Sequence, residues 1–347
     1  MRLSFRKPLV ALGTTLLLAT ISSLVDRARA VAGVTRDSAG ADWSALLEAA
    51  EHQFGRGNYA SAIAALRSVI SQNPLSAEAF YWLGRCYFEI HDYDNAISHG
   101  EKSVSLEPNN SVFKQWLGRS YGAKADRDKS FFAARKAKKQ FEEAVGADPS
   151  NVDARRDLEQ FCLEAPWIVG GSNDEAHAQA VAIAKIDPEQ GFMASGMFDE
   201  QALNRPDLAE NDYRQALSAK PRQMDDYFDV AAFFERRNKL ADMMATLDTA
   251  ARINANDPRL MIFRAEAMVM SGSDLRDAEE YLKSYLASTP NRSDWPPHAA
   301  AREWLGRLYE AQGKRAEAAE QYRASLELDP RRKTARERLD SLEKFAR

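Results

Sequence analysis

The tetrapeptide Trp-Leu-Gly-Arg occurs three times in this chain, at residues 82–85, 116–119 and 304–307. The first two copies begin 34 residues apart. Each copy is followed two residues later by a tyrosine, at Tyr87, Tyr121 and Tyr309. A fixed interval of this length indicates a structural repeat, and a repeat array grows by adding units instead of enlarging one core.

A proline closes each segment of the pattern. Eight prolines mark these ends: Pro74, Pro108, Pro149, Pro188, Pro221, Pro258, Pro290 and Pro330. The last segment preserves the order of large and small residues best, with Leu305, Gly306, Tyr309, Gly313, Ala318 and Tyr322 before its proline. The pattern resembles the tetratricopeptide repeat family over about residues 42–332. The segments between residues 189 and 290 are the most degenerate.

This resemblance implies an all-α fold, a right-handed superhelical solenoid of about eight helix pairs, in which each helix buries an apolar stripe against its neighbours. Residues 42–332 form the solenoid, with units ending near the eight prolines. Residues 333–347 form a final amphipathic helix, because Leu339, Leu342 and Phe345 lie on one face. We expect this helix to cap the array.

The first thirty residues have the character of an export signal. Arg2, Arg6 and Lys7 precede an apolar run over residues 8–25, and Ala28 and Ala30 supply a small-x-small cleavage pattern. We expect a signal peptide over residues 1–30, a linker over 31–41 and a periplasmic or secreted protein. An uncleaved inner-membrane anchor is the alternative, and membrane contact is expected only in that case.

Composition and motifs exclude several functions. The chain has 47 basic and 51 acidic residues and a net charge of −4, which argues against nucleic-acid binding. The two cysteines, Cys86 and Cys162, lie two repeats apart and are expected to be buried free thiols. No nucleotide-binding, hydrolase or metal-ligand motif is present, and the five histidines are scattered. We therefore predict no enzymatic activity, no cofactor and no metal site.

The candidate binding residues come from helix geometry. At about 100° per residue, Leu83, Tyr87 and Phe80 share the packed face of their helix, whereas Trp82 and Arg85 lie opposite. The resemblance implies that the first helices of the units line a concave groove that binds peptides or partner helices. We predict a protein or peptide partner, with acidic groups, on these residues: Tyr81, Trp82, Arg85, Gln115, Trp116, Arg119, Arg155, Trp304 and Arg307. The alternative is that the tryptophans pack between neighbouring first helices.

The third unit carries an insertion over residues 122–139 with a local excess of positive charge. One interpretation is a lengthened, solvated helix pair; the other is a docking site for an anionic surface on a membrane-tethered subunit of an envelope assembly, secretion or maturation complex. The fourth unit is interrupted by residues 167–172, where Gly170 and Gly171 shape a turn and Ser172 with Glu175 forms a capping box. A contact loop that presents Trp167 is a further alternative.

Overall fold

A computed structural model describes residues 38–288, 292–293 and 295–344. The predicted signal segment lies outside the described residues. The chain divides into two compact units, unit 1 up to Lys220 and unit 2 from Pro221 onward. All regular structure in the described ranges is helical. Among the helices described, none combines the length and the apolar character needed to cross a membrane.

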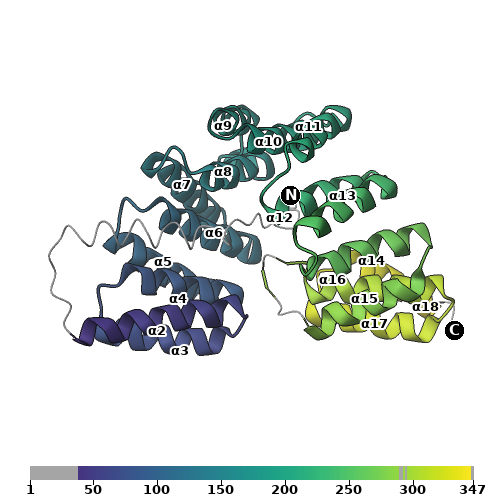
Figure 1. The fold of residues 1–347 in the computed structure, drawn as a ribbon, viewed down its shortest axis with the longest axis horizontal. Coiled ribbons are helices and arrows are strands. Elements are labelled where there is room, and N and C mark those ends of the chain that lie inside the picture. The colour runs from purple at the N-terminus through teal and green to yellow at the C-terminus, as the bar shows by residue number, and fades with distance from the viewer. Residues whose placement is uncertain (1–37, 289–291, 294, 345–347) are drawn as a thin grey trace. The chain divides into compact units, whose positions relative to one another are not determined.

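Unit 1 contains five antiparallel helix pairs (Figure 1), and each helix packs against the next along the chain. The pairs are α2 (Ser38–Gly55) with α3 (Tyr59–Gln72), α4 (Ala77–Glu89) with α5 (Tyr93–Leu106), α6 (Ser111–Asp128) with α7 (Phe131–Ala147), α8 (Val152–Glu164) with α9 (Asn173–Ile186), and α10 (Pro188–Gln201) with α11 (Pro206–Ser218). A 3-10 turn, η1 (Trp167–Val169), interrupts the fourth pair.

Unit 2 contains three further pairs and a single last helix. They are α12 (Met224–Arg236) with α13 (Leu240–Ile253), α14 (Arg259–Ser271) with α15 (Leu275–Ser288), α16 (His298–Ala311) with α17 (Arg315–Leu328), and then α18 (Lys333–Lys344). Leu339 and Leu342 of α18 pack against the core of unit 2. Phe345, the third residue of the predicted stripe, lies outside the described residues.

Short polar side chains begin many of these helices. Ser76 accepts a hydrogen bond from the amide of Ala79, and Asn110 accepts one from the amide of Phe113. These bonds satisfy amides that have no partner inside the helix. The predicted capping box is half formed: Ser172 accepts from the amide of Glu175, but the Glu175 carboxylate binds Lys138 instead of closing the box.

Glycine sets the distance between the two helices of a pair. A Cβ atom on Gly118 of α6 would lie 2.6 Å from the Phe141 ring of α7, and one on Gly306 would lie 2.6 Å from the Tyr322 ring. The ring occupies the space that a side chain would need, so the helices approach closely. With eight pairs and a last helix in the described ranges, the prediction of an all-α helix-pair array is confirmed.

Candidate functional site

The three Trp-Leu-Gly-Arg copies lie on first helices of their pairs, at α4, α6 and α16. The prediction that their tryptophans and arginines all face away from packed surfaces is wrong in part. Arg85 is only 4% exposed and Trp304 only 5%. Helix periodicity identified the side that packs within the pair, but neighbouring pairs cover part of the opposite side as well.

Arg85 is enclosed by four aromatic rings. Its guanidinium carbon lies 3.7 Å from the ring centre of Trp116, 4.7 Å from that of Phe54 and 5.1 Å from that of Trp82. Tyr81 supplies the fourth ring, and its hydroxyl accepts a hydrogen bond of 3.2 Å from Arg85 Nη1. Arg85 Nε has no hydrogen-bond partner. We call Phe54, Tyr81, Trp82 and Trp116 the aromatic cage; cation–π attraction in this buried setting stabilises the charge.

The cage continues into an ion pair on the next two first helices. Trp116 lies between Arg85 and Arg119, whose guanidinium carbon is 4.6 Å from the same ring. Arg119 Nε donates to Asp157 of α8 at 2.7 Å, and Gln115 donates to the same carboxylate oxygen at 2.7 Å. Burial lowers the pKa of Arg119, but the Asp157 charge outweighs it and the pKa is raised. The structure therefore joins Tyr81, Trp82, Arg85, Gln115, Trp116 and Arg119 into one network.

Arg155 is not part of this network. It donates to the carbonyl of Pro149 and, at 2.8 Å, to Gln179 of α9. Its neighbour Arg156 is the buried arginine of α8, and it donates to Gln190 of α10 at 2.9 Å. The sequence predicts Arg155 as a binding residue beside Arg85 and Arg119, but it does not occupy their position in the repeat: Gln160, not Arg155, follows Leu158 at the distance at which Arg85 follows Leu83.

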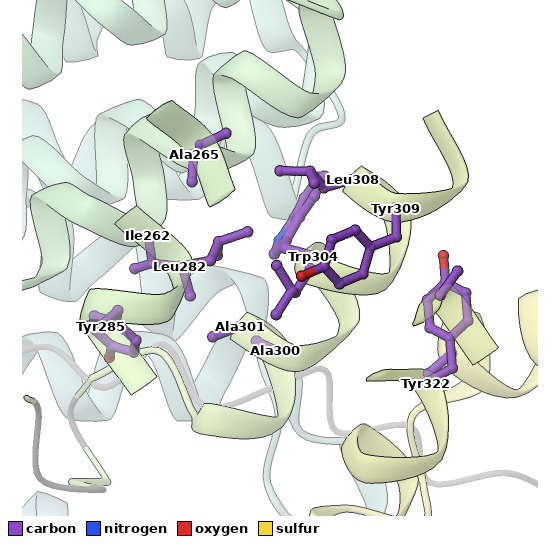
Figure 2. Close-up of a cluster of buried hydrophobic side chains, with 14 residues drawn as sticks. Ile262, Ala265, Leu282, Tyr285, Ala300, Ala301, Trp304, Leu308, Tyr309 and Tyr322 are labelled. Carbon is purple, nitrogen blue, oxygen red and sulfur yellow. The ribbon is translucent and has the colours of Figure 1, made fainter. Parts of the chain in front are cut away.

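The third copy has different surroundings. Figure 2 shows Trp304 inside the core of unit 2, near Leu308 and Tyr309. The Arg307 guanidinium lies over the Trp304 ring at 3.7 Å, and Arg307 is half-buried. Arg307 makes no hydrogen bond or ion pair within the described part of the chain.

An open pocket of about 320 Å³ lies beside this guanidinium. Val269 and Met270 of α14 line it together with Arg307, Glu310, Ala311 and Arg338. Glu310 is already engaged, since it pairs with Arg338 at 2.7 Å and accepts from the Tyr322 hydroxyl. Burial and the nearby Arg338 charge lower the pKa of Arg307. The pocket thus has two cations and one acid that is already paired, and none of its lining residues forms an ion pair with Arg307.

Two acidic residues of the first helices also stand out. Glu159 of α8 is fully buried, and neither carboxylate oxygen has a hydrogen-bond partner. Burial raises its pKa well above the usual value. Glu51 of α2 is half-buried, and burial together with Glu78 raises its pKa to about 7. Glu159 occupies the position that Gly118 has in α6, and the sequence pattern gave no sign that this acid would be enclosed.

Most charges of the basic third unit are paired. Lys124 and Arg127 pair with Asp94 and Asp128, and Lys138 pairs with Glu175 at 2.7 Å and with Glu142. Further ion pairs of this region are Lys129 with Asp126, Lys136 with Glu101 and Lys139 with Glu143. Within the described residues Arg135 has no acidic partner and donates to the carbonyl of Ile168 instead. The lengthened helix pair is therefore a surface of largely matched charges.

The described residues contain no group of three or more His, Cys, Asp or Glu side chains that could hold a metal ion. Cys86 and Cys162 are both buried and free, and burial raises the pKa of each thiol to about 12. Neither thiol is ionised near neutral pH, so neither is a ready nucleophile.

Comparison with known proteins bears on the repeated fold. A family profile of the tetratricopeptide repeat matches residues 47–111 and 270–333. These two stretches are therefore similar to tetratricopeptide repeats. The two matched stretches include the first and third Trp-Leu-Gly-Arg copies, and proteins built from such repeats are scaffolds suited to binding other proteins. No curated protein matches the sequence.

One solved structure shares the fold at low identity, and two others are similar at lower TM-scores. The APC/C hetero-tetramer Cut9-Hcn1 matches with 14% identity and a TM-score of 0.51, over 96% of this chain and 61% of that chain. This chain therefore spans less than two thirds of that relative's length. A tetratricopeptide repeat protein from Parabacteroides merdae has 14% identity, a TM-score of 0.46, and coverage of 88% and 100%. MamA has 19% identity, a TM-score of 0.38, and coverage of 53% and 95%.

Proposed function

We propose that the protein is a non-enzymatic scaffold that binds an acidic segment of a partner protein, with Arg307 as the main anchor. The observation that carries this proposal is the half-buried Arg307 guanidinium, which stacks on Trp304, lines an open pocket and makes no hydrogen bond to any residue that the structure describes. A guanidinium has five donors in a planar fork, and a carboxylate matches two of them.

The pocket walls define the segment further. Val269 and Met270 are apolar, whereas Arg307 and Arg338 are basic. An acidic side chain or a terminal carboxylate next to an apolar side chain would satisfy both kinds of wall. Because Glu310 is held by Arg338 and Tyr322, an incoming carboxylate would not have to displace it from Arg307.

Binding by the residues of unit 1 stays a prediction. A partner carboxylate would have to displace Asp157 from Arg119 or enter the aromatic cage around Arg85. Both changes disrupt buried contacts, so we place the first anchor at Arg307 and Trp304.

We also propose a periplasmic location, on the strength of the basic, apolar and small-residue pattern over residues 1–30. Docking on an anionic surface through the third unit is less favoured, because all of its lysines and arginines except Arg135 already have acidic partners. Such a surface exerts little long-range attraction on lipid or polysaccharide anions.

Peptide binding tests the proposal. A fluorescent peptide with two glutamates beside a leucine is titrated with the full chain, and fluorescence anisotropy reports the affinity. Arg307→Gln should weaken binding about tenfold, because a charge-assisted bidentate contact is lost. Arg315→Gln is the matched control, since Arg315 is exposed on α17 and away from the pocket.

Two results would contradict the proposal. One is equal affinity of the wild type and Arg307→Gln for the acidic peptide. The other is equal affinity of the wild type for the acidic peptide and for one with lysines in place of its glutamates.

A further inference from the structure

Four large apolar side chains are exposed together where α7 begins and where η1 interrupts the fourth pair. Trp167 is 80% exposed and Phe132 71%, and Phe131 and Ile168 are 46% and 40% exposed. We call these four residues the α7–η1 patch. Monomeric proteins rarely leave so many large apolar groups exposed in one place unless the surface binds something.

Hydrogen bonds hold the two parts of the patch next to each other. Arg135 lies one turn after Phe131 on α7 and donates to the carbonyl of Ile168 at 3.0 Å. Lys138, in the next turn, donates to the carbonyl of Gly170 at 2.9 Å. Val169, between them, is buried in the core of unit 1. These two hydrogen bonds therefore hold the 3-10 turn against α7.

Two glycines fix the shape of this turn. Gly170 has a φ of +106°, a backbone conformation that other residues rarely adopt. A Cβ atom on Gly171 would lie 1.8 Å from the carbonyl oxygen of Ala165, so no larger residue fits there. Trp167 is consequently displayed by a rigid turn, and little conformational entropy is lost when its ring becomes buried.

Most charges around the patch are paired, and Arg135 is the exception among the described residues, since it donates only to the Ile168 carbonyl. Lys136 lies over the Phe132 ring at 5.2 Å and pairs with Glu101, while Lys129 pairs with Asp126. Lys139 pairs with Glu143. With Arg135 as a single cation that lacks an acidic partner, the rim exerts only a weak field on an anionic partner, so attraction must come mainly from the apolar rings.

We propose that the α7–η1 patch contacts the interface of a lipid bilayer by inserting Trp167 and Phe132. The rings protrude from the surface, and a bilayer accommodates protruding rings without needing a complementary pocket. Tryptophan favours the headgroup region, and lysine side chains at such a rim can extend toward water. The apolar run at residues 8–25 would bring the chain to a membrane in the first place. This proposal does not depend on peptide binding at Arg307.

Site-specific labelling of the full chain tests the proposal. The two native cysteines are buried, so a cysteine introduced by Phe132→Cys can be labelled selectively with an environment-sensitive fluorophore. Leu75→Cys is the matched control, because Leu75 is 72% exposed in the loop between α3 and α4. We expect a blue shift and quenching by spin-labelled lipid at position 132, and neither at position 75. The effect should be similar on phosphatidylcholine vesicles with and without phosphatidylglycerol, and it should persist at high salt.

An unlabelled variant gives a second measurement. Trp167→Ser should reduce the affinity for phosphatidylcholine vesicles about tenfold, whereas Leu75→Ser should leave it unchanged. Equal environments at positions 132 and 75 would overturn the proposal, as would binding that requires phosphatidylglycerol and disappears at high salt. A concentration-dependent blue shift at position 132 without vesicles would assign the patch to a protein partner instead of a membrane.

Discussion

The Trp-Leu-Gly-Arg copies of unit 1 and the copy of unit 2 have the same four residues in opposite environments. In unit 1, Arg85 lies in the aromatic cage and Arg119 pairs with Asp157. In unit 2, Arg307 stacks on Trp304 and lines an open pocket, and among the described residues it makes no hydrogen bond or ion pair. The arginine of the motif is therefore held by partners in one unit and lines a pocket in the other, where we propose that it binds.

The next helix pair decides between the two outcomes. Asp157 precedes Leu158 of α8 as Trp116 precedes Leu117 of α6, so an acid stands where the repeat has a tryptophan. That acid reaches back to Arg119. Unit 2 ends with α18, whose Arg338 binds Glu310 and leaves Arg307 unpaired. The same repeated residue can therefore be paired in one unit and left without an ion pair in another, depending on what the next helix supplies.

Charge reversal at Arg85 should have the largest effect. Arg85→Glu would place an unpaired carboxylate against aromatic ring faces, and we expect a loss of about 3–5 kcal/mol in the free energy of unfolding. Arg85→Met should lose much less, since it retains the packing of the side-chain stem. Urea unfolding with hydrogen exchange in α4 and α6 measures both. If Arg85→Glu unfolded like the wild type, the contrast between the two units would be lost.

Neutralising Glu159 should have a pH-dependent effect in unit 1. Burial raises the pKa of the Glu159 carboxyl in the folded protein. As pH rises above about 4.5, the unfolded chain therefore releases this proton before the folded chain does. The free energy of unfolding falls as a result. Glu159→Gln removes that loss. The variant should match the wild type near pH 4 and gain about 1.4 kcal/mol relative to it for each pH unit above the unfolded pKa, until the folded pKa is reached.

Thermal unfolding from pH 4 to pH 8 measures this difference. Parallel curves for the wild type and Glu159→Gln would mean that the buried carboxylate is stabilised by solvent or by a partner, and would contradict the raised pKa.

Gly118→Ala and Gly306→Ala test what the two units share. In each, the new methyl group meets a ring at 2.6 Å, so we expect a cost of about 1–3 kcal/mol from overpacking. A second substitution that replaces the ring should restore stability: Phe141→Leu in the Gly118→Ala variant and Tyr322→Leu in the Gly306→Ala variant. A neutral effect at either glycine would show that its helix pair can separate without cost.

Arg307→Gln should have the smallest effect on stability. Only its contact with the Trp304 ring is lost, which corresponds to about 0.5–1 kcal/mol. The same variant should show the tenfold loss of acidic-peptide affinity described above. A large fall in the unfolding midpoint would instead place Arg307 with Arg85 among the structural arginines.

Part of the site was accessible from the sequence and part was not. The repeated motif identified Trp304 and Arg307, which line or support the pocket. Asp157 and Arg156 were missed because nothing in their own repeat marks them; they matter only through Arg119 and Gln190 on other pairs. The basic insertion was visible, but its acidic partners Asp94, Glu101 and Glu175 come from other helices.

The sequence alone determined the helix pairs, because the proline spacing, the caps and the apolar stripes are local patterns with a helical period. It also determined close approach within pairs, through glycines such as Gly118 and Gly306. Only the tertiary structure decided which arginines are buried or paired and which are not. Exposure and charge pairing depend on side chains 30 to 40 residues away, as with Arg119 and Asp157, 38 residues apart. Such pairs leave no periodic signal, so a helix face specifies where a side chain points and not what it meets there.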